Sequence, residues 1–446
     1  MDSSRVERRN VESLGDAIQL SSVFRAGGQT HALLSDMGAH KTVLSELPPT
    51  LGEEFGPLLK GGEAPAGTPL ELDVGGKVEG YGVFEFPYGP VSWGVPEAGG
   101  FKLVTYGERV VKVIPQVNFK KRGVERSVVG RTPQDALLII ERSAGNFSAS
   151  YSTCFLTAVE DYLGLEVPLK ARWTRAAAIE LERICNHLYV FGRLAEAASQ
   201  NVAASQASAL RERVLRLNSK RFGHRYLFGF NAVGGVLPDL SREERKELST
   251  AVRLIAREFS ELVAYFLSSR IFLDRLQGTA RLERDDALSL GAVGPAARGS
   301  GLLWDDRLTY PIDPYEDIYV NVETDAGEDT MARTMVRVRE IESSTIVLRE
   351  ILDRMPGDGV KSKNRSKHQR DGDVPDDLAL CRIESPSGDL IQVVQLDMQG
   401  RVSNLHVRPA SLVNWLPFAR SMENNVFTDF QFAFESFGLS YADSDR

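Results

Sequence analysis

The residues best suited to metal or redox chemistry are three cysteines, Cys154, Cys185 and Cys381, and one histidine, His187. A metal site built from such ligands usually shows two of them a few residues apart, and no two of these cysteines are close in sequence. An odd set of isolated cysteines is typical of reduced thiols in a protein core. His187 lies on an apolar helical stretch, where a packing histidine is more common than a metal ligand. The sequence therefore predicts no metal site.

A second candidate site is the stretch from residue 134 to residue 160, QDALLIIERSAGNFSASYSTCFLTAVE. Its middle part, residues 141–148, reads ERSAGNFS and resembles the Glu-Arg-Val-Cys-Gly-Ile-Cys-Ser line of nickel-iron hydrogenase large subunits. The two cysteines of that line are replaced by Ala144 and Phe147. Because a soft thiolate cage selects such a metal centre, the replacements argue against a hydrogenase active site.

Further segments resemble blocks of the same family and follow in its order. They are residues 89–92 with Glu97 and residues 101–103, residues 121–125 (KRGVE), 180–183 (ELER), 186–188 (NHL), 221–222, 234–236, 294–301 (GPAARGSG), 306–307, 310–311, and 327–329 with Arg333, Val336, Arg337 and Glu340. The chain is identified as a member of the family shared by energy-converting nickel-iron hydrogenase large subunits and the quinone-site large subunit (the D-type subunit) of NADH-quinone oxidoreductase, complex I. Within that family it resembles cysteine-less members of the hydrogenase-4 and formate hydrogenlyase branch.

The resemblance implies an α+β fold that is mainly helical, with a small N-terminal antiparallel sheet followed by a long helical bundle, as in hydrogenase large subunits. The residue patterns agree. Short alternating runs at residues 81–86, 101–106 and 110–113 predict antiparallel strands. Ser241 and Glu244 form a capping-box pattern, and the apolar stripe that follows predicts a long helix, as does the spacing over residues 172–198.

The family-like domain covers residues 79–446. An N-terminal segment precedes it, and an insertion interrupts it. Residues 1–78 are polar and rich in Gly and Pro, and we interpret them as a partly ordered N-terminal segment. Residues 355–377 are polar and charged and are predicted to be a mobile insertion. The pattern from residue 378 to residue 407 alternates strands and turns.

The overall composition agrees with one component of a larger complex. The chain has 446 residues, 42% hydrophobic and 26% charged, with a net charge of −8, which gives no reason to expect nucleic acid as a partner. Its first residues lack an apolar signal core, and no apolar run approaches the roughly 20 residues that span a bilayer. We expect a peripheral position on the cytoplasmic face of the cell membrane, reached through partner subunits.

The resemblance also implies where a site would lie. Glu97 aligns with a possible proton carrier and is the candidate catalytic residue, although the histidines of that loop are replaced, one of them by Ser92. The tyrosine-bearing Asp-Tyr-Leu-His of complex I corresponds to residues 144–147, and the arginine of the Glu-Ser-Pro-Arg-Gly-Glu turn has become Ser387. The C-terminal Asp-Pro-Cys-x-x-Cys line corresponds to residues 438–443, GLSYAD. The candidate residues lining a cofactor or acceptor are Arg142, Asn146, Ser387 and Tyr441.

Two functions remain open at this point. One is an oxidoreductase component whose cavity binds a quinone or another organic electron acceptor; the other is a scaffold that holds an iron-sulfur protein against a membrane proton-translocating arm. In both, the resemblance implies three kinds of partner: an iron-sulfur small subunit like the B-type one of complex I, a protein like its C-type one, and membrane subunits. Iron-sulfur clusters and NAD(H) would be on those partners. No G-x-G-x-x-G motif follows a strand here. An open tunnel to Phe147 would favour the acceptor function and a filled one the scaffold.

Overall fold

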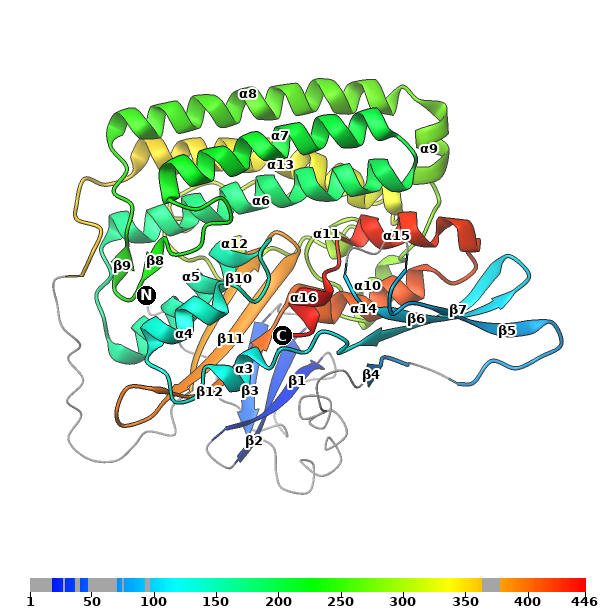
Figure 1. The fold of residues 1–446 in the computed structure, drawn as a ribbon, viewed down its shortest axis with the longest axis horizontal. Coiled ribbons are helices and arrows are strands. Elements are labelled where there is room, and N and C mark those ends of the chain that lie inside the picture. The colour runs from blue at the N-terminus through cyan, green and yellow to red at the C-terminus, as the bar shows by residue number, and fades with distance from the viewer. Residues whose placement is uncertain are drawn as a thin grey trace.

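The computed structural model describes residues 18–26, 29–36, 41–46, 70–73, 76–92, 97–362 and 378–446. It confirms the predicted fold class: helices are the main secondary structure, and the sheets are small and antiparallel (Figure 1). Among the described residues, no helix is both long enough and apolar enough to cross a membrane.

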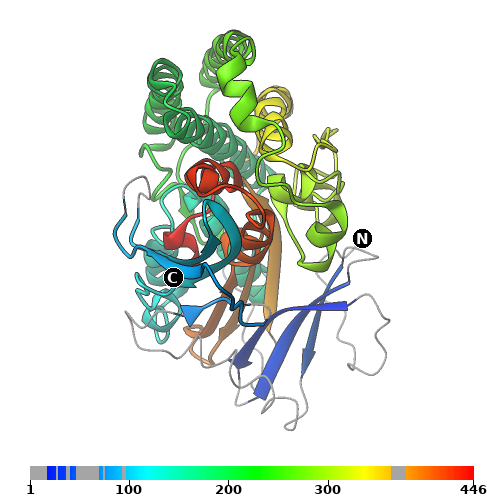
Figure 2. The same cartoon turned by 90° about the vertical axis from the view of Figure 1, so that its right-hand side faces the viewer.

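The helical bundle consists of α6 (Leu169–Ala197), α7 (Asn201–Phe222), α8 (Arg242–Leu267) and α13 (Thr330–Arg354). Figure 1 shows them running side by side along the long axis, and Figure 2 shows them nearly end on. The start of α8 is the predicted capping box, in which the Ser241 hydroxyl accepts from the Glu244 amide and the Glu244 carboxylate accepts from the Ser241 amide. The predicted stripe on α8 is buried. Most of α6 is buried all round, so its charged side chains need partners inside the protein.

A three-stranded sheet lies beneath the bundle, with β10 (Ala379–Ser385), β11 (Gly388–Leu396) and β12 (Val402–Arg408) in that order. The central strand β11 is buried on both faces. One face packs on α5 (Ser148–Leu163), where Gln392 donates to the Tyr151 carbonyl. These strands follow the predicted pattern, and their turn at Ser387 belongs to the candidate site.

The other face of β11 is covered by a sheet that the sequence analysis did not anticipate. Its strands are β1 (Ile18–Ala26), β2 (Gln29–Asp36) and β3 (Lys41–Glu46). Phe24 and Leu33 of this sheet pack with Ile391 and Val393 of β11, and the Phe24 ring stacks on His406 with centroids 4.6 Å apart. Part of the N-terminal segment is therefore an ordered layer on the main domain; most of its remaining residues lie outside the described ones.

The predicted N-terminal strands of the domain form a third sheet, in the order β4-β7-β6-β5. Its members are β4 (Leu70–Glu71), β5 (Val83–Tyr88), β6 (Gly100–Tyr106) and β7 (Arg109–Val117). Phe101 packs edge-on against Phe430 and Phe434 of α15 (Phe430–Phe437), forming a separate core with α14 (Ala410–Ser421). The loop from β5 to β6 and the last helix, α16 (Tyr441–Ser444), meet beside this core.

The predicted insertion begins with residues that make fixed contacts. Met355 is buried in the main core, and the backbone of Val360 and Ser362 bonds to Val236 and Gly234 around the short strands β8 (Asn231–Ala232) and β9 (Gly235–Val236). Residues 363–377, on which the prediction of mobility mainly falls, lie outside the described residues.

The remaining helices are short and connect these parts. They are α3 (Val124–Ser127), α4 (Pro133–Ile140), α9 (Arg270–Leu276), α10 (Arg284–Ser289), α11 (Gly294–Arg298), α12 (Asp306–Thr309) and the 3-10 helix η2 (Phe427–Asp429).

Candidate functional site

The turn between α4 and α5 carries the first two positions at which hydrogenases have cysteine. Helix α4 begins where predicted, with the Thr132 hydroxyl accepting from the Asp135 amide. At the other end of the turn, the buried Glu182 carboxylate on α6 accepts from the amides of Ala149 (2.6 Å) and Ser150 (3.1 Å). Burial raises the pKa of Glu182 to about 7, although these hydrogen bonds oppose the shift. Glu182 thus anchors the first turn of α5 to the bundle.

The other two cysteine positions are filled by Ser440, at the turn between α15 and α16, and by Asp443, within α16. Asp443 is buried; its carboxylate accepts from the Tyr151 hydroxyl at 2.6 Å and from the Ser411 amide at 3.2 Å. The Ser440 hydroxyl caps α16 by accepting from the Asp443 amide. Both side chains therefore already have partners within the protein.

Arg122 joins the two turns. Its guanidinium donates to the carbonyls of Ser143, in the α4–α5 turn, and Ala442, in α16, the latter at 2.8 Å. Residues far apart in sequence thus meet at the side chain of Arg122. The sequence analysis quoted Arg122 and Glu182 only within longer blocks. A charged residue such as Glu182 inside an otherwise apolar helical stretch was the available signal that it would be bound internally.

Glu97, the predicted proton carrier, contacts the same C-terminal turn. Its carboxylate accepts from the Ala442 amide at 2.6 Å and lies 3.5 Å from the Ser440 hydroxyl. The side chain is only partly buried. This geometry gives Glu97 a structural role at the start of α16, and its role as a proton carrier stays a prediction.

Tyr441, a predicted lining residue, fills the space next to Glu97. Its side chain is 1% exposed, and a Cβ added to Gly99 would lie 1.9 Å from the ring, so only glycine permits this packing. Burial raises the Tyr441 pKa well above its usual range. Its hydroxyl has no hydrogen-bond partner among the described residues.

Two further predicted residues lie on the outer side of the α4–α5 turn. Asn146 is partly exposed and accepts from Arg211, whose guanidinium stacks on Tyr189 at 4.7 Å. Arg142 points away from this group: it pairs with Glu141 and lies 4.9 Å from the centroid of the Phe228 ring. Glu97 and Tyr441 thus lie together, whereas no described hydrogen bond links Asn146 or the Arg142 side chain to them.

Ser387 lies in the buried turn between β10 and β11. Its carbonyl would be 2.1 Å from a Cβ on Gly294, which has a positive φ of 62°. Only glycine at residue 294 therefore lets this turn pack so closely. The Ser387 side chain is 3% exposed, and its hydroxyl has no partner among the described residues. No described hydrogen bond links it to the other four predicted residues.

A network of buried charges lies behind this turn. Arg298 binds Glu340 at 2.8 Å and Glu384 at 2.7 Å, and Arg183 donates to the carbonyls of Glu384 and Ser385. His187 bonds to Glu340 at 2.6 Å, and burial lowers the His187 pKa to about 4. This agrees with the interpretation of His187 as a packing residue. Burial raises the pKa of Glu384 to about 8.

The residues present do not fit a nickel-iron centre. The four positions at which the family has cysteine hold Ala144, Phe147, Ser440 and Asp443, which provide no thiolate, and the two polar ones are committed to internal hydrogen bonds. Among the described residues, no three His, Cys, Asp or Glu side chains are arranged to hold a metal ion. Cys154, Cys185 and Cys381 are free and buried, and the Cys154 thiol contacts the Cys381 carbonyl at 3.3 Å.

The residues also do not fit a quinone head group at Phe147. That side chain is 2% exposed and belongs to the main hydrophobic core, so it offers almost no surface to a ligand. Whether an acceptor binds elsewhere in the candidate site stays a prediction.

Comparisons with known proteins identify the family of this chain. The family model of the respiratory-chain NADH dehydrogenase 49 Kd subunit matches residues 202–446. Membrane-bound hydrogenase subunit alpha of Pyrococcus furiosus is 27% identical, over 81% of this chain and 87% of its own length. Formate hydrogenlyase subunit 5 of Escherichia coli is 26% identical, over 81% and 62%. A D-type subunit of NADH-quinone oxidoreductase from Thermodesulfovibrio yellowstonii is 26% identical, over 76% and 91%.

A solved structure has the same fold. A chain in the membrane-bound sulfane sulfur reductase (MBS), an archaeal respiratory membrane complex, aligns with a TM-score of 0.76 and 23% identity, covering 82% of this chain and 98% of that one. The family model covers more than half of the chain, and the order of the sequence blocks and the meeting of the two turns agree with it. This chain belongs to the family of the respiratory-chain NADH dehydrogenase 49 Kd subunit, which the resemblance to the complex I large subunit and the energy-converting hydrogenases predicted.

Proposed function

We propose that this chain is the large peripheral subunit of a membrane-associated, complex I-like oxidoreductase and serves there as a connecting subunit without a nickel-iron centre. The observation that carries the proposal is the internal bonding of the former metal positions. Asp443 is bound by Tyr151 and Ser411, Phe147 is in the core, and the Tyr441 ring packs on Gly99. At the positions where relatives have metal ligands, these contacts instead hold α5, α16 and the β5–β6 loop together.

The family membership supports the rest of the proposal. Relatives are named as subunits of membrane-bound hydrogenase, formate hydrogenlyase and NADH-quinone oxidoreductase. The partners we propose are an iron-sulfur small subunit like the B-type one of complex I, a protein like its C-type one, and membrane subunits. Together they would hold this chain on the cytoplasmic face of the membrane. Iron-sulfur clusters and NAD(H) would be bound by those partners.

Affinity purification from gently solubilised membranes tests this proposal. A tagged full-length chain should recover an iron-sulfur protein and at least one integral membrane protein in constant ratio, identified by mass spectrometry. The same tag on an unrelated cytosolic protein is the control. Recovery of the tagged chain as a stable lone monomer would contradict the proposal.

A second candidate function, binding of an organic electron acceptor such as a quinone, is favoured by the unpaired hydroxyls. Tyr441 and Ser387 are nearly fully buried, and neither hydroxyl has a partner among the described residues. A buried polar group without a partner costs about 1–3 kcal/mol, which a bound carbonyl oxygen would offset. Photoaffinity labelling of the assembled complex with a quinone analogue separates the two functions, since a purely connecting role predicts no labelling near Asn146 or Tyr441.

A further inference from the structure

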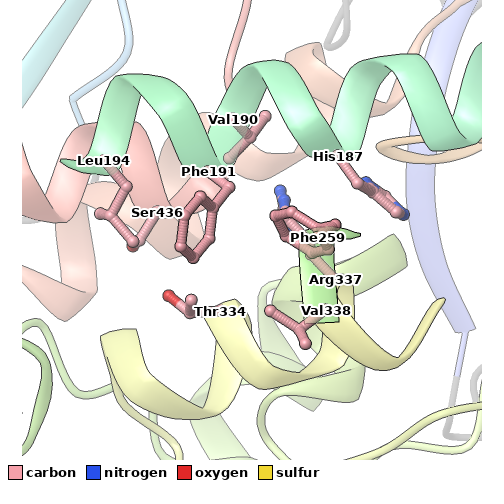
Figure 3. Close-up of a pocket in the computed structure, with 9 residues that line it drawn as sticks. All are labelled: His187, Val190, Phe191, Leu194, Phe259, Thr334, Arg337, Val338 and Ser436. Carbon is pink, nitrogen blue, oxygen red and sulfur yellow. The ribbon is translucent and has the colours of Figure 1, made fainter. Parts of the chain in front are cut away.

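A small, largely buried pocket lies inside the helical bundle, next to the C-terminal segment of the candidate site. It is formed by α6, α8, α13 and α15, and Figure 3 shows the side chains around it. Its lining residues are His187, Val190, Phe191, Leu194, Phe259, Thr334, Arg337, Val338 and Ser436. All of these except Val338 are buried. The space admits about one particle of the size of a water molecule or a small ion.

Arg337 brings a buried positive charge to this pocket. Its side chain donates through Nη2 to the Phe437 carbonyl at 2.8 Å, whereas Nε and Nη1 have no partner among the described residues. No described carboxylate forms an ion pair with Arg337. A buried cation without a counter-charge is costly, since burial removes its hydration.

Glu340 favours the protonated form of Arg337 through its charge alone, without a hydrogen bond to it. Glu340, one turn further along α13, is already bound by Arg298 at 2.8 Å and by His187 at 2.6 Å. Arg333, one turn earlier, is also buried and is bound by neutral acceptors such as the Ser436 hydroxyl and the Ala280 carbonyl. Two guanidinium groups thus follow one another along α13, and neither forms an ion pair with a described carboxylate, although the charges of Asp329 and Glu340 favour their protonation.

Gly438 lies next to the Arg337 guanidinium and provides no carboxylate for it. A Cβ at Gly438 would lie 2.8 Å from Nη2 of Arg337 and 3.1 Å from the Val190 side chain, both part of the pocket wall. Residue 438 is also the position of the aspartate in the hydrogenase line Asp-Pro-Cys-x-x-Cys that residues 438–443 resemble. An aspartate at 438 would place a carboxylate against Arg337, and glycine supplies none.

We propose that this pocket binds one small monovalent anion, chloride, on the free edge of the Arg337 guanidinium. The rest of the wall suits a weakly hydrated halide, because Val190, Phe191 and Leu194 are apolar. The hydroxyls of Thr334 and Ser436 donate to backbone carbonyls of their own helices. The Nδ1 atom of His187 provides no proton when Nε2 donates to Glu340, so the anion rests on Arg337 alone.

Arg337 must be protonated to bind an anion, and burial affects its pKa. Burial lowers the pKa of Arg337 to about 10, and burial together with the charge of Arg337 lowers the pKa of Arg333 to about 9. Both side chains nevertheless remain protonated near neutral pH. A bound anion would stabilise both charges and so stabilise the folded chain by mass action.

Denaturation of the full-length chain tests the proposal, with chloride replacing gluconate at constant ionic strength. Chloride at about ten times its dissociation constant should raise the ratio of folded to unfolded chain about tenfold. Arg337→Gln should abolish this dependence, whereas Arg349→Gln, an exposed arginine on the same helix, should retain it. An equal response to gluconate and chloride in the wild-type chain, or a retained response in Arg337→Gln, would overturn the proposal.

Two further measurements keep the test decisive if Arg337→Gln does not fold. Gly438→Asp should supply the missing carboxylate and remove the chloride dependence, and Gly438→Asn, with the same backbone strain and no charge, should not. Crystals of the wild-type chain grown in bromide should show an anomalous peak beside Arg337. A water molecule only at that position, with no anomalous signal, would refute the anion site.

Discussion

Glu97 accepts a hydrogen bond from the Ala442 amide, and a glutamine at this position could accept it equally well. If Glu97 is structural, Glu97→Gln should leave the turnover of the assembled complex within about twofold, and Glu97→Ala should lower the free energy of unfolding by about 1 kcal/mol through loss of the contact. Turnover assays and chemical denaturation measure the two quantities. A proton carrier would respond differently: Glu97→Gln would lower turnover by at least about tenfold, or roughly 1.4 kcal/mol of barrier, in a complex that still assembles.

Glu182 makes a prediction about pH. Its pKa in the folded chain, raised to about 7 by burial, exceeds the ordinary value of 4.5. The carboxyl group therefore contributes stability that is fully present below pH 4.5 and is lost as the pH rises through about 7, an effect on the order of 3 kcal/mol. Denaturation from pH 5 to pH 8 should show wild type losing stability relative to Glu182→Gln.

The control for this pH effect is Glu196→Gln, which changes an exposed glutamate on the same helix. That variant should follow the wild-type pH profile. Parallel profiles for wild type and Glu182→Gln would mean that the buried carboxyl does not change its ionisation over this range.

At the scale of elements, the turn between β10 and β11 depends on Gly294. Gly294→Ala should destabilise the chain by about 3 kcal/mol or more, because alanine combines the strain of a positive φ with a clash against the Ser387 carbonyl. Gly223→Ala is the matched control. Gly223 also has a positive φ, of 87°, but a Cβ there would meet nothing within 4 Å, so only the strain of roughly 1–2 kcal/mol should appear. Chemical denaturation measures the free energy of unfolding of both variants. Similar decreases in the two would show that the Ser387 carbonyl does not pack closely on Gly294.

The elements that the sequence predicts well are those fixed by neighbouring residues. The capping box at Ser241, the stripe of α8 and the turn at Ser387 each depend on a local pattern, and each is found where expected. The sheet β1–β3 was missed because its apolar side chains pack on Ile391 and Val393, several hundred residues away. A segment rich in polar residues gives no local sign of such a distant partner.

The sequence indicates which segments could form the candidate site, and the role of that site stays a prediction. In the structure the α4–α5 turn and the C-terminal residues meet at the side chain of Arg122. That Tyr441 fills the space over Gly99, and that Asp443 is bound by Tyr151, depends on side-chain packing between segments about 300 residues apart. Spacing along the sequence does not report such contacts.

At the scale of the whole molecule, the replaced thiolates lead to a prediction about metal content. The complex purified with this chain should contain iron from its iron-sulfur partner but far less than one nickel per chain, and it should evolve no hydrogen from reduced viologen. The physical reason is that a thiolate metal site contributes binding free energy on the order of 10 kcal/mol or more, which Ser440 and Asp443 cannot replace while they are bound to the rest of the protein. Elemental analysis and gas chromatography measure the two quantities, with a nickel-iron hydrogenase purified in the same way as the positive control. One nickel per chain would contradict the assignment of these four positions, and hydrogen evolution without nickel would require a catalytic centre elsewhere in the complex.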